Sequence, residues 1–282
     1  MGRTNWKPFP HADAAYDYAG EKLKKNWSRL HRGDCEPYPD ETWTAAISAR
    51  HEGLAAKGGS ARAAVVLQEA WRAYHRGDFA QAVDLGLAIG PLGYAVAAKA
   101  ANIYASYLET DTKRQLALFE ESAARCEDLA KIAPDWPNAF YFSAQALGRY
   151  SQGISVVTAL TQGIGGRVQA ALKKALALEP KHADAEIGLG VYNAEVISKV
   201  GSVVGKLTYG ASKEAALAHF EKALKLNPGS AIAHIEFANG LVMLFGKSKL
   251  EAATSLYRKA AGCTPMDAME RLDVEAAKAE LE

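Results

Sequence analysis

The chain has 282 residues, of which 49% are apolar and 23% are charged, values that are ordinary for a globular protein. Its 33 lysines and arginines nearly balance 32 aspartates and glutamates, so overall charge gives no reason to expect nucleic acid as a partner. No apolar run reaches the length of about 18 residues that a transmembrane segment needs, so none is expected.

The three cysteines lie far apart in the sequence and show neither the spacing of a disulfide framework nor that of a zinc site. This usage fits reduced thiols in a cytoplasmic protein. The amino terminus carries no apolar stretch typical of an export signal. We therefore expect a cytoplasmic location.

Alanine, leucine and charged residues recur every three to four positions along almost the whole chain, and alternating runs of Val, Ile and Thr are nearly absent. This periodicity predicts helices and no sheet. Glycines and prolines interrupt the pattern at short intervals, which predicts that each helix is short. The fold class is therefore predicted to be all-α.

The amino-terminal part contains one repeated motif, since WSRLHRGD at 27–34 recurs as WRAYHRGD at 71–78. In each copy we expect a helix to end at the glycine, which can adopt a positive φ, and the aspartate to cap the next helix. We divide this part into an amino-terminal helical segment, residues 1–60, and divergent helix pairs, residues 61–133.

The carboxy-terminal part contains a plainer repeat, with ALKKALALEP at 171–180, AHFEKALKLNP at 218–228 and a weaker copy, SLYRKAAGCTP, at 255–265. Each copy matches the second helix of a tetratricopeptide repeat. A small residue (Ala175, Ala223, Ala260) lets neighbouring helices approach closely, and the proline ends the helix. Leu-Gly pairs at 147–148 and 189–190 match the close-packing pair of the first helices.

The units are longer than the roughly 34 residues of a standard tetratricopeptide repeat. The additional residues fall between paired helices, at about 152–166 and 198–212. Insertions of this kind lie on one face of a solenoid, often the binding face. The sequence therefore predicts a tetratricopeptide-like helical-repeat solenoid over residues 134–282, with extended insertions between paired helices. An open alternative is that the helix pairs before residue 134 belong to the same continuous solenoid.

Several stretches of this part carry a family likeness: LGRY at 147–150 leading into ISVV at 154–157, the helix ends ALEP and KLNP, and GLGVY at 188–192 before a long insertion. On these stretches, residues 134–282 resemble the regulator-of-microtubule-dynamics family and its bacterial relatives. A weaker likeness is to the T component of TRAP transporters, also tetratricopeptide-like. The resemblance implies a tether or adaptor whose concave surface takes a peptide or an apolar ligand, and it implies no catalytic residue.

Residues 136–178 and 196–213 contain no aspartate or glutamate, although both stretches carry lysine or arginine. One interpretation is a basic groove with apolar walls that receives an acidic peptide or a carboxylate terminus, with Arg149 and Arg167 as a bidentate clamp. The other interpretation is buried apolar helices with a few exposed cations. Under the basic-groove interpretation we predict nine binding residues, namely two arginines, two lysines, three tyrosines that form aromatic walls and two asparagines that bind peptide backbone. They are Arg149, Tyr150, Arg167, Tyr192, Asn193, Lys199, Lys206, Tyr209 and Asn239.

No motif indicates catalysis, a metal or a cofactor. GSVVGKLT at 201–208 has three residues between its glycines instead of four, and leucine follows the lysine, so it is no phosphate-binding loop. His182, Asp184 and Glu186 follow Pro180 and are interpreted as residues of a helix start. We expect no enzyme, no bound metal and no cofactor.

The leading hypothesis is a non-enzymatic adaptor or scaffold that binds a protein segment in the concave groove of the array. A second is a carrier of an apolar or anionic amphipathic small molecule, held by residues 154–160 and 196–207. A third is a self-assembling structural protein, because array ends stack unless they are capped, and residues 273–282 form an acidic cap. Homo-oligomers are compatible with each.

Overall fold

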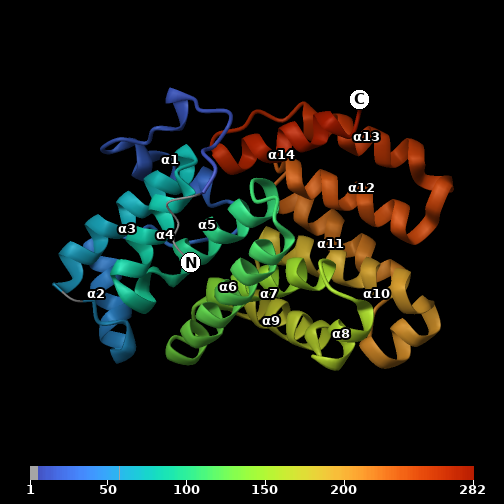
Figure 1. The fold of residues 1–282 in the computed structure, drawn as a ribbon, viewed down its shortest axis with the longest axis horizontal. Helices are drawn as coiled ribbons and strands as arrows, with labels where there is room; N and C mark the ends of the chain where they lie inside the picture. The colour runs from blue at the N-terminus through green and yellow to red at the C-terminus, as the bar shows by residue number, and fades with distance from the viewer. Residues whose placement is uncertain (1–5, 57) are drawn as a thin grey trace.

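The structure is a computed structural model that describes residues 6–56 and 58–282. Every regular element in these residues is a helix, which confirms the all-α prediction (Figure 1). The amino-terminal elements are η2 (Ala14–Tyr16), α1 (Lys22–Leu30), α2 (Glu41–Arg50), η3 (Glu52–Leu54), α3 (Gly59–Arg76), α4 (Phe79–Ala88), η4 (Gly90–Gly93), α5 (Tyr94–Tyr107) and α6 (Thr112–Ile132). The carboxy-terminal elements are α7 (Pro137–Gln152), α8 (Val156–Thr161), α9 (Ile164–Leu178), α10 (Ala183–Tyr209), α11 (Lys213–Leu226), α12 (Ala231–Phe245), η5 (Gly246–Lys249), α13 (Leu250–Ala261) and α14 (Ala268–Ala279). None of these helices is both long and apolar enough to cross a bilayer.

Consecutive helices pack side by side along the chain: α3 with α4, α4 with α5, α5 with α6, α6 with α7, α7 with α9, α10 with α11 and α12 with α13. This is the arrangement of a helical-repeat solenoid, as the sequence predicts. The two predicted insertions contain α8 and the distal part of α10, which is kinked at Gly201 (φ 80°). One hydrophobic cluster runs from Phe9 to Leu272, so the helix pairs share a core, and the boundaries at 60 and 133 stay a prediction.

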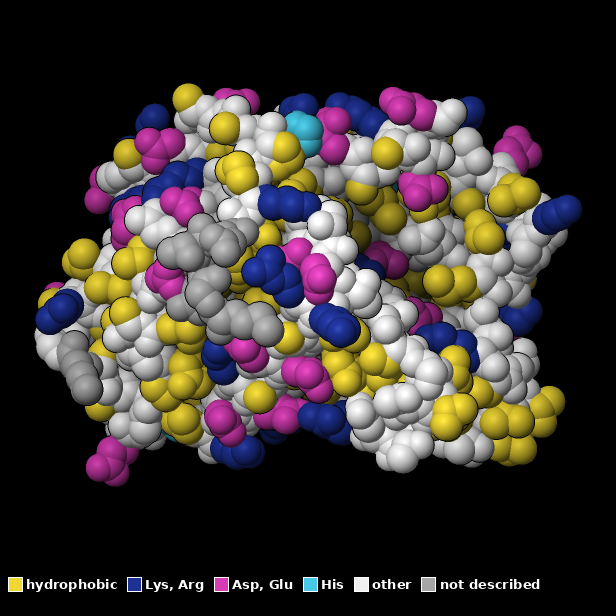
Figure 2. Space-filling model, viewed as in Figure 1, with side chains coloured by type: hydrophobic (Ala, Val, Ile, Leu, Met, Phe, Trp, Pro, Cys, Tyr) yellow, Lys and Arg dark blue, Asp and Glu magenta, His cyan; other side chains and the backbone are white. Residues whose placement is uncertain are grey.

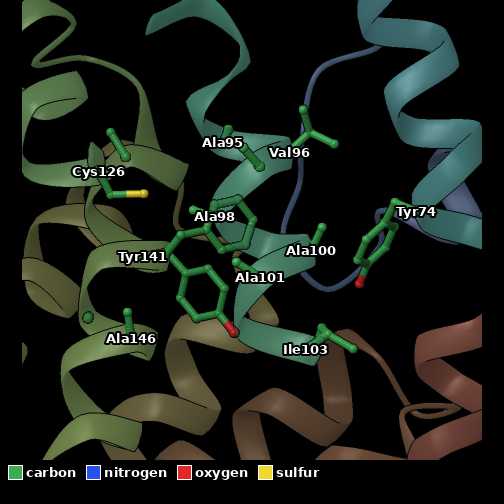
Figure 3. Packing of buried hydrophobic residues seen from close by; sticks show 14 of the residues in the cluster. Tyr74, Ala95, Val96, Ala98, Ala100, Ala101, Ile103, Cys126, Tyr141 and Ala146 are labelled. Atoms are coloured by element: carbon green, nitrogen blue, oxygen red, sulfur yellow. The ribbon is translucent and has the colours of Figure 1, made fainter. Parts of the chain in front are cut away.

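Helix α5 lies at the centre of this core, and its small side chains allow helices from both sides to approach (Figure 3). Tyr74 of α3 lies on one side of α5, and Cys126 of α6 and Tyr141 of α7 lie on the other. Because α5 is surrounded, polar residues on it are forced to find partners inside the molecule. Lys99 is the charged residue of α5 that is buried in this way.

The repeated motif WxxxHRGD behaves differently in its two copies. In the second copy Gly77 has a φ of 91° and ends α3, and the Asp78 side chain accepts a hydrogen bond from the backbone N–H of Gln81 in α4, as expected. In the first copy the expectation is wrong, because Asp40, not Asp34, caps α2. Gly33 has no positive φ. A glycine is required at this position because a Cβ atom would lie 2.3 Å from Oδ1 of Asp184.

The carboxy-terminal repeats pack closely at Gly190, as predicted, and also at Gly240, which the sequence did not single out. The ring of Phe220 on α11 lies between Gly190 of α10 and Gly240 of α12, where added Cβ atoms would approach it to 2.7 and 2.5 Å. The Leu-Gly pair at 147–148 does not serve this purpose, since a Cβ at Gly148 would meet no other group within 4 Å. Gly148 instead faces open space.

The last helix returns to the beginning of the chain, and α14 lies beside α1 in Figure 1. The hydroxyl of Tyr18 donates to the carbonyl of Met266 (2.6 Å), and His75 Nδ1 lies 2.8 Å from Oδ2 of Asp267. Arg29 pairs with Glu270 at 2.6 Å. The two ends of the array therefore contact each other, and acidic residues of α14 point into these contacts.

Candidate functional site

A cavity of about 280 Å³ lies where α5, α7, α9, α10 and α14 converge, and we call it the central cavity. Its lining also includes the loop after α1 and the start of α12. Figure 2 shows this face hollowed to the right of centre, with acidic side chains in its depth. Elements distant in sequence thus build one concave site.

The charged residues of the lining are mainly acidic. Six carboxylates line the cavity: Asp34, Asp184, Glu195, Glu236, Glu270 and Asp273. Three cations line it: Lys99, Arg149 and Lys199. A basic groove was one of the two interpretations of the acid-free stretches, and the cavity has the opposite balance of charges.

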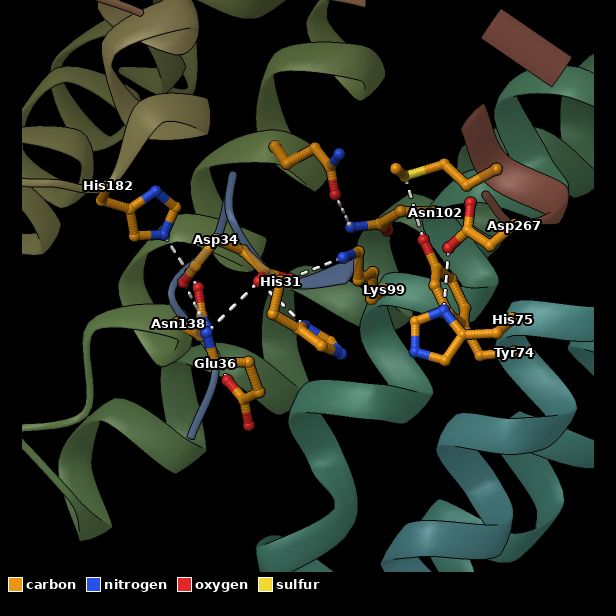
Figure 4. Close-up of polar contacts among 12 residues, drawn as sticks. His31, Asp34, Glu36, Tyr74, His75, Lys99, Asn102, Asn138, His182 and Asp267 are labelled. Carbon is orange, nitrogen blue, oxygen red and sulfur yellow. Dashed lines mark hydrogen bonds and ion pairs between the residues drawn. The ribbon is translucent and has the colours of Figure 1, made fainter. Parts of the chain in front are cut away.

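A buried ion pair lies at the cavity floor. Lys99 Nζ is 2.6 Å from Oδ2 of Asp34, and Nδ1 of His31 is 2.9 Å from Oδ1 of the same carboxylate (Figure 4). Burial alone would raise the pKa of Asp34, but the charge of Lys99 and the bond from His31 hold it well below its usual value. Burial lowers the pKa of His31 to about 4, so the imidazole is neutral near pH 7 and acts as a hydrogen-bond donor.

The same loop is fixed to α7 and α10 by a second set of hydrogen bonds. Asn138 donates to the carbonyl of Asp34 (3.0 Å) and to the carboxyl of Glu36, and it accepts from Nε2 of His182 (2.9 Å). His182 also caps α10, because its Nδ1 accepts from the backbone N–H of Ala185 at 3.1 Å. Burial, reinforced by the charge of Asp34, raises the pKa of Glu36 to about 8.

Two cavity carboxylates have no cationic partner in the described residues. The side chain of Asp184, at the start of α10, accepts no hydrogen bond and forms no ion pair there, and burial raises its pKa to about 7. Asp273 of α14 accepts a hydrogen bond from the Tyr107 hydroxyl, and burial raises its pKa well above the usual value. Both groups line the central cavity.

Comparison with known proteins identifies the family. The family model described as "Regulator of microtubule dynamics protein 1-3" matches residues 91–282, about two thirds of the chain. The chain belongs to the regulator of microtubule dynamics family. This confirms the resemblance seen in the sequence, and the match begins earlier than the expected residue 134.

Two solved structures resemble this family member. The thermophilic TPR protein TTC0263 of Thermus thermophilus superposes with a TM-score of 0.54 at 16% identity, covering 77% of this chain and 99% of that one. The MamA protein gives a TM-score of 0.40 at 15% identity, covering 78% and 95%. The first likeness confirms a tetratricopeptide-like fold. No curated protein matches this chain.

The proposed arginine clamp is not assembled in this family member. Arg149 lines the cavity and pairs with Glu236 at 2.7 Å. Arg167 pairs with Glu127 of α6 and does not line the cavity. The two arginines therefore serve separate ion pairs, because α7 and α9 present them to different neighbours.

The other seven predicted binding residues divide into two groups. Three line the cavity: Tyr192, Lys199 and Tyr209. Four do not: Tyr150, Asn193, Lys206 and Asn239. The two amides bond within the array, since Asn193 accepts from the Ser212 N–H (3.0 Å) and Asn239 accepts from the Tyr257 hydroxyl. The role of these seven residues in binding stays a prediction.

The sequence analysis missed four residues that define the cavity: Asp34, Lys99, Asp184 and Asp273. The sequence pattern predicts a helix cap at Asp34, a dipole-compensating residue at Asp184 and part of a terminal cap at Asp273. The available signal was Lys99, a lone lysine inside the apolar run that forms α5. A cation at such a position needs a buried carboxylate partner.

Exposed apolar side chains lie on α8 and on the distal part of α10, two helices that contribute to the cavity lining. Helix α8 has no buried residue, although it carries Val156, Val157 and Leu160, and Val156 and Leu160 line the cavity. On the distal part of α10, Leu207 is 82% exposed and Val203 is 72% exposed. We call these five residues the apolar rim; exposed apolar groups gather at the lower right of Figure 2, near α8 and the end of α10.

Proposed function

We propose that this chain is a non-enzymatic adaptor that binds a protein segment in its central cavity. The observation that carries the proposal is the cavity itself, because helices α5, α7, α8, α9, α10, α12 and α14 and the loop after α1 leave about 280 Å³ unfilled between them. This volume is near the lower end of the roughly 300–1,000 Å³ usual for ligand pockets. It suits side chains of a short segment better than a folded domain.

The lining supports the same proposal. Apolar residues such as Ile103, Val168 and Leu172 supply contact area, and a few charged and aromatic groups supply orientation. The likeness to a TPR protein supports the adaptor class, since such arrays present concave binding surfaces. With three free cysteines, we place this adaptor in the cytoplasm.

Gly148 offers a direct test, because it lines the cavity and a Cβ there meets no other group within 4 Å. Leucine at this position of α7 should extend into the cavity without disturbing the fold, and leucine favours helices more than glycine does. Random dodecapeptides would be selected by display on immobilised wild type, Gly148→Ala and Gly148→Leu. Alanine is the matched control, since it adds a single methyl group.

We expect peptides that enrich on wild type and Gly148→Ala to be lost on Gly148→Leu, while circular dichroism shows all three proteins folded. Equal enrichment on all three variants would place peptide binding outside the cavity. Absence of enrichment on wild type would count against the adaptor.

A second candidate, a carrier of an apolar molecule, is favoured by the apolar rim, whose exposed side chains continue into the cavity wall at Val156 and Leu160. Native mass spectrometry after gentle purification separates the two candidates. A reproducible additional mass supports the carrier, and clean apoprotein contradicts it. The acidic lining favours a neutral or cationic cargo over an anionic amphipath.

Self-assembly receives less support. In the acidic stretch proposed as a cap, residues 273–282, two carboxylates have partners in the same chain: Asp273 bonds to Tyr107, and Glu275 pairs with Arg271 and Lys278. We therefore do not propose self-assembly as a function of this chain.

A further inference from the structure

The ion pairs of the central cavity leave an excess of negative charge. Four lining carboxylates have a cationic partner within 3 Å: Asp34 with Lys99, Glu195 with Lys199, Glu236 with Arg149, and Glu270 with Arg29. Asp184 and Asp273 have none in the described residues. When both ionise, they leave the cavity with two uncompensated negative charges.

Asp184 is held at the cavity wall by its backbone and by close packing. Its N–H donates to the carbonyl of Gly33 at 3.0 Å, and its carboxylate lies directly against Gly33. Its side-chain oxygens accept nothing from the described residues, although neighbouring N–H groups at a helix start usually bond to such an aspartate. Here His182 already takes the capping position, so the carboxylate of Asp184 is left for another partner.

Asp273 approaches the cavity from α14. Its side chain is buried, with 3% relative exposure, and only Oδ1 has a partner, the hydroxyl of Tyr107. Oδ2 is left without a hydrogen-bond donor in the described residues. Because Oδ2 is not fully enclosed by protein atoms and Asp273 lines the cavity, this oxygen can accept a hydrogen bond from a donor in the cavity.

Tyr141 lines the same cavity as Asp184 and Asp273. Its hydroxyl is influenced by Asp184, Asp34 and Asp273, and burial followed by these charges raises its pKa well above the usual value. Aromatic rings add a favourable electrostatic surface for a cation. Tyr107, bound to Asp273, lines the same space.

We infer that the central cavity binds an ammonium or guanidinium cation between Asp184 and Asp273, with Tyr141 and Tyr107 beside it. This inference rests on the proposed function in assigning ligand binding to the central cavity. It specifies a basic group, where the sequence had suggested an acidic partner. The cation would be a lysine or arginine side chain of a bound segment, or a free organic amine.

The physical reason is that two carboxylates without a cation, Asp184 partly buried and Asp273 buried, destabilise the empty protein. Carboxylates without a cation persist in binding sites because the ligand needs them. Replacing them commonly stabilises the fold and abolishes binding. A purely structural carboxylate would behave in the opposite way, since its removal breaks bonds that hold the fold. The two roles therefore predict opposite signs for the change in melting temperature.

The binding should also depend on pH, because a cation binds the ionised carboxylates. The groups that influence Asp184 are Asp34, Lys99 and Glu270, and those that influence Asp273 are Tyr107, Glu270, Asp267 and Asp184. Protons displaced on binding pass to the buffer. Affinity should fall from pH 8 to pH 6 as Asp184, whose pKa burial raises to about 7, becomes protonated.

The test uses n-octylammonium, n-octanol and n-octanoate as probes, titrated calorimetrically into the full chain at pH 8. We expect octylammonium to bind at least about tenfold more tightly than the other two, a difference of about 1.4 kcal/mol. Asp184→Asn and Asp273→Asn should each weaken it at least about tenfold and leave the melting temperature equal or higher. Glu275→Gln is the control, because Glu275 is on α14 but outside the lining, and it should change nothing.

A peptide pair identifies the source of the cation: acetyl-Leu-Ala-Lys-Ala-Leu-amide and the same peptide with acetyl-lysine. If the lysine peptide binds more tightly than the acetyl-lysine peptide, the cation comes from a protein segment. If octylammonium binds and neither peptide does, the cation is a free amine and the adaptor proposal is wrong. If both peptides bind equally and Gly148→Leu abolishes their binding, the adaptor proposal stands and the cation site is overturned. The cation site is equally overturned if octylammonium fails to bind, or if either asparagine variant keeps its affinity or melts lower.

Discussion

The Nζ atom of Lys99 and the Oδ2 atom of Asp34 lie 2.6 Å apart in the buried floor of the cavity. Lys99 is in the middle of α5, and Asp34 is in the loop after α1. The ammonium group also lies 5.1 Å from the ring centroid of Tyr74. This pair therefore fixes the amino-terminal loop onto the central helix and shapes one wall of the site.

Lys99→Met should lower the free energy of unfolding by about 3–5 kcal/mol, because it leaves the Asp34 carboxylate buried without its cation. Urea unfolding followed by circular dichroism measures the change. The double variant Lys99→Met with Asp34→Asn should recover part of the loss, since no buried charge remains. Lys199→Met is the control: its pair with Glu195 is more exposed, so it should change stability by less than about 1 kcal/mol. A Lys99→Met protein as stable as wild type would show that the pair contributes little.

The fold could be predicted largely from local patterns, whereas the site could not. Ala175, Ala223 and Ala260 are buried as the repeat requires, because helix contacts repeat with the sequence period. The cavity depends on partners far apart, such as Asp34 with Lys99, and on α14 returning across the array. Acid-free stretches describe the charge of a segment, but the cavity takes its carboxylates from other segments.

The stability of the protein should fall as pH rises from 6.5 to 8.5. Burial raises the pKa of Glu36 from 4.5 to about 8 and that of Asp184 from 3.8 to about 7. Across this window the folded state therefore retains protons that the unfolded state has already released, and this stabilisation is lost as pH passes each folded pKa. His31 and His182, whose pKa values burial lowers to about 4, are neutral in the folded state. In the unfolded state they lose most of their remaining protons between about pH 6.5 and 7.5, so they offset the decline only at the start of the window.

Thermal melts at half-unit pH intervals measure this effect. Glu36→Gln should flatten the decline between pH 7 and 8.5, since glutamine keeps the bond to Asn138 and does not titrate. Glu275→Gln, at an exposed ion pair, should keep the wild-type slope. A wild-type melting temperature that is level or rising across the window would contradict the raised pKa values.

The contact of Phe220 with two helix glycines should make both positions intolerant of a methyl group. Gly240→Ala brings Cβ to 2.5 Å from Cε2 of the ring, and forcing the helices apart should destabilise the protein by about 1–3 kcal/mol. Gly148→Ala should instead be neutral or stabilising by up to about 1 kcal/mol, because its Cβ enters open space and alanine favours the helix. Chemical denaturation compares the two. Combining Gly240→Ala with Phe220→Leu should restore part of the loss, and no recovery would locate the strain elsewhere.

The two arginines once expected to form a clamp should differ in their effect on stability. Arg149→Gln removes the 2.7 Å pair between α7 and α12 and leaves Glu236, which is largely buried, without a cation. We expect a loss of about 1–2 kcal/mol, less than for a fully buried pair because the Arg149 side chain is 34% exposed. Arg167→Gln should change stability by less than about 1 kcal/mol, because both members of its pair with Glu127 are exposed. Measuring each single variant by urea unfolding before any binding assay separates loss of a ligand contact from loss of fold. Equal losses in the two variants would show that the pair at Glu236 has no special structural role.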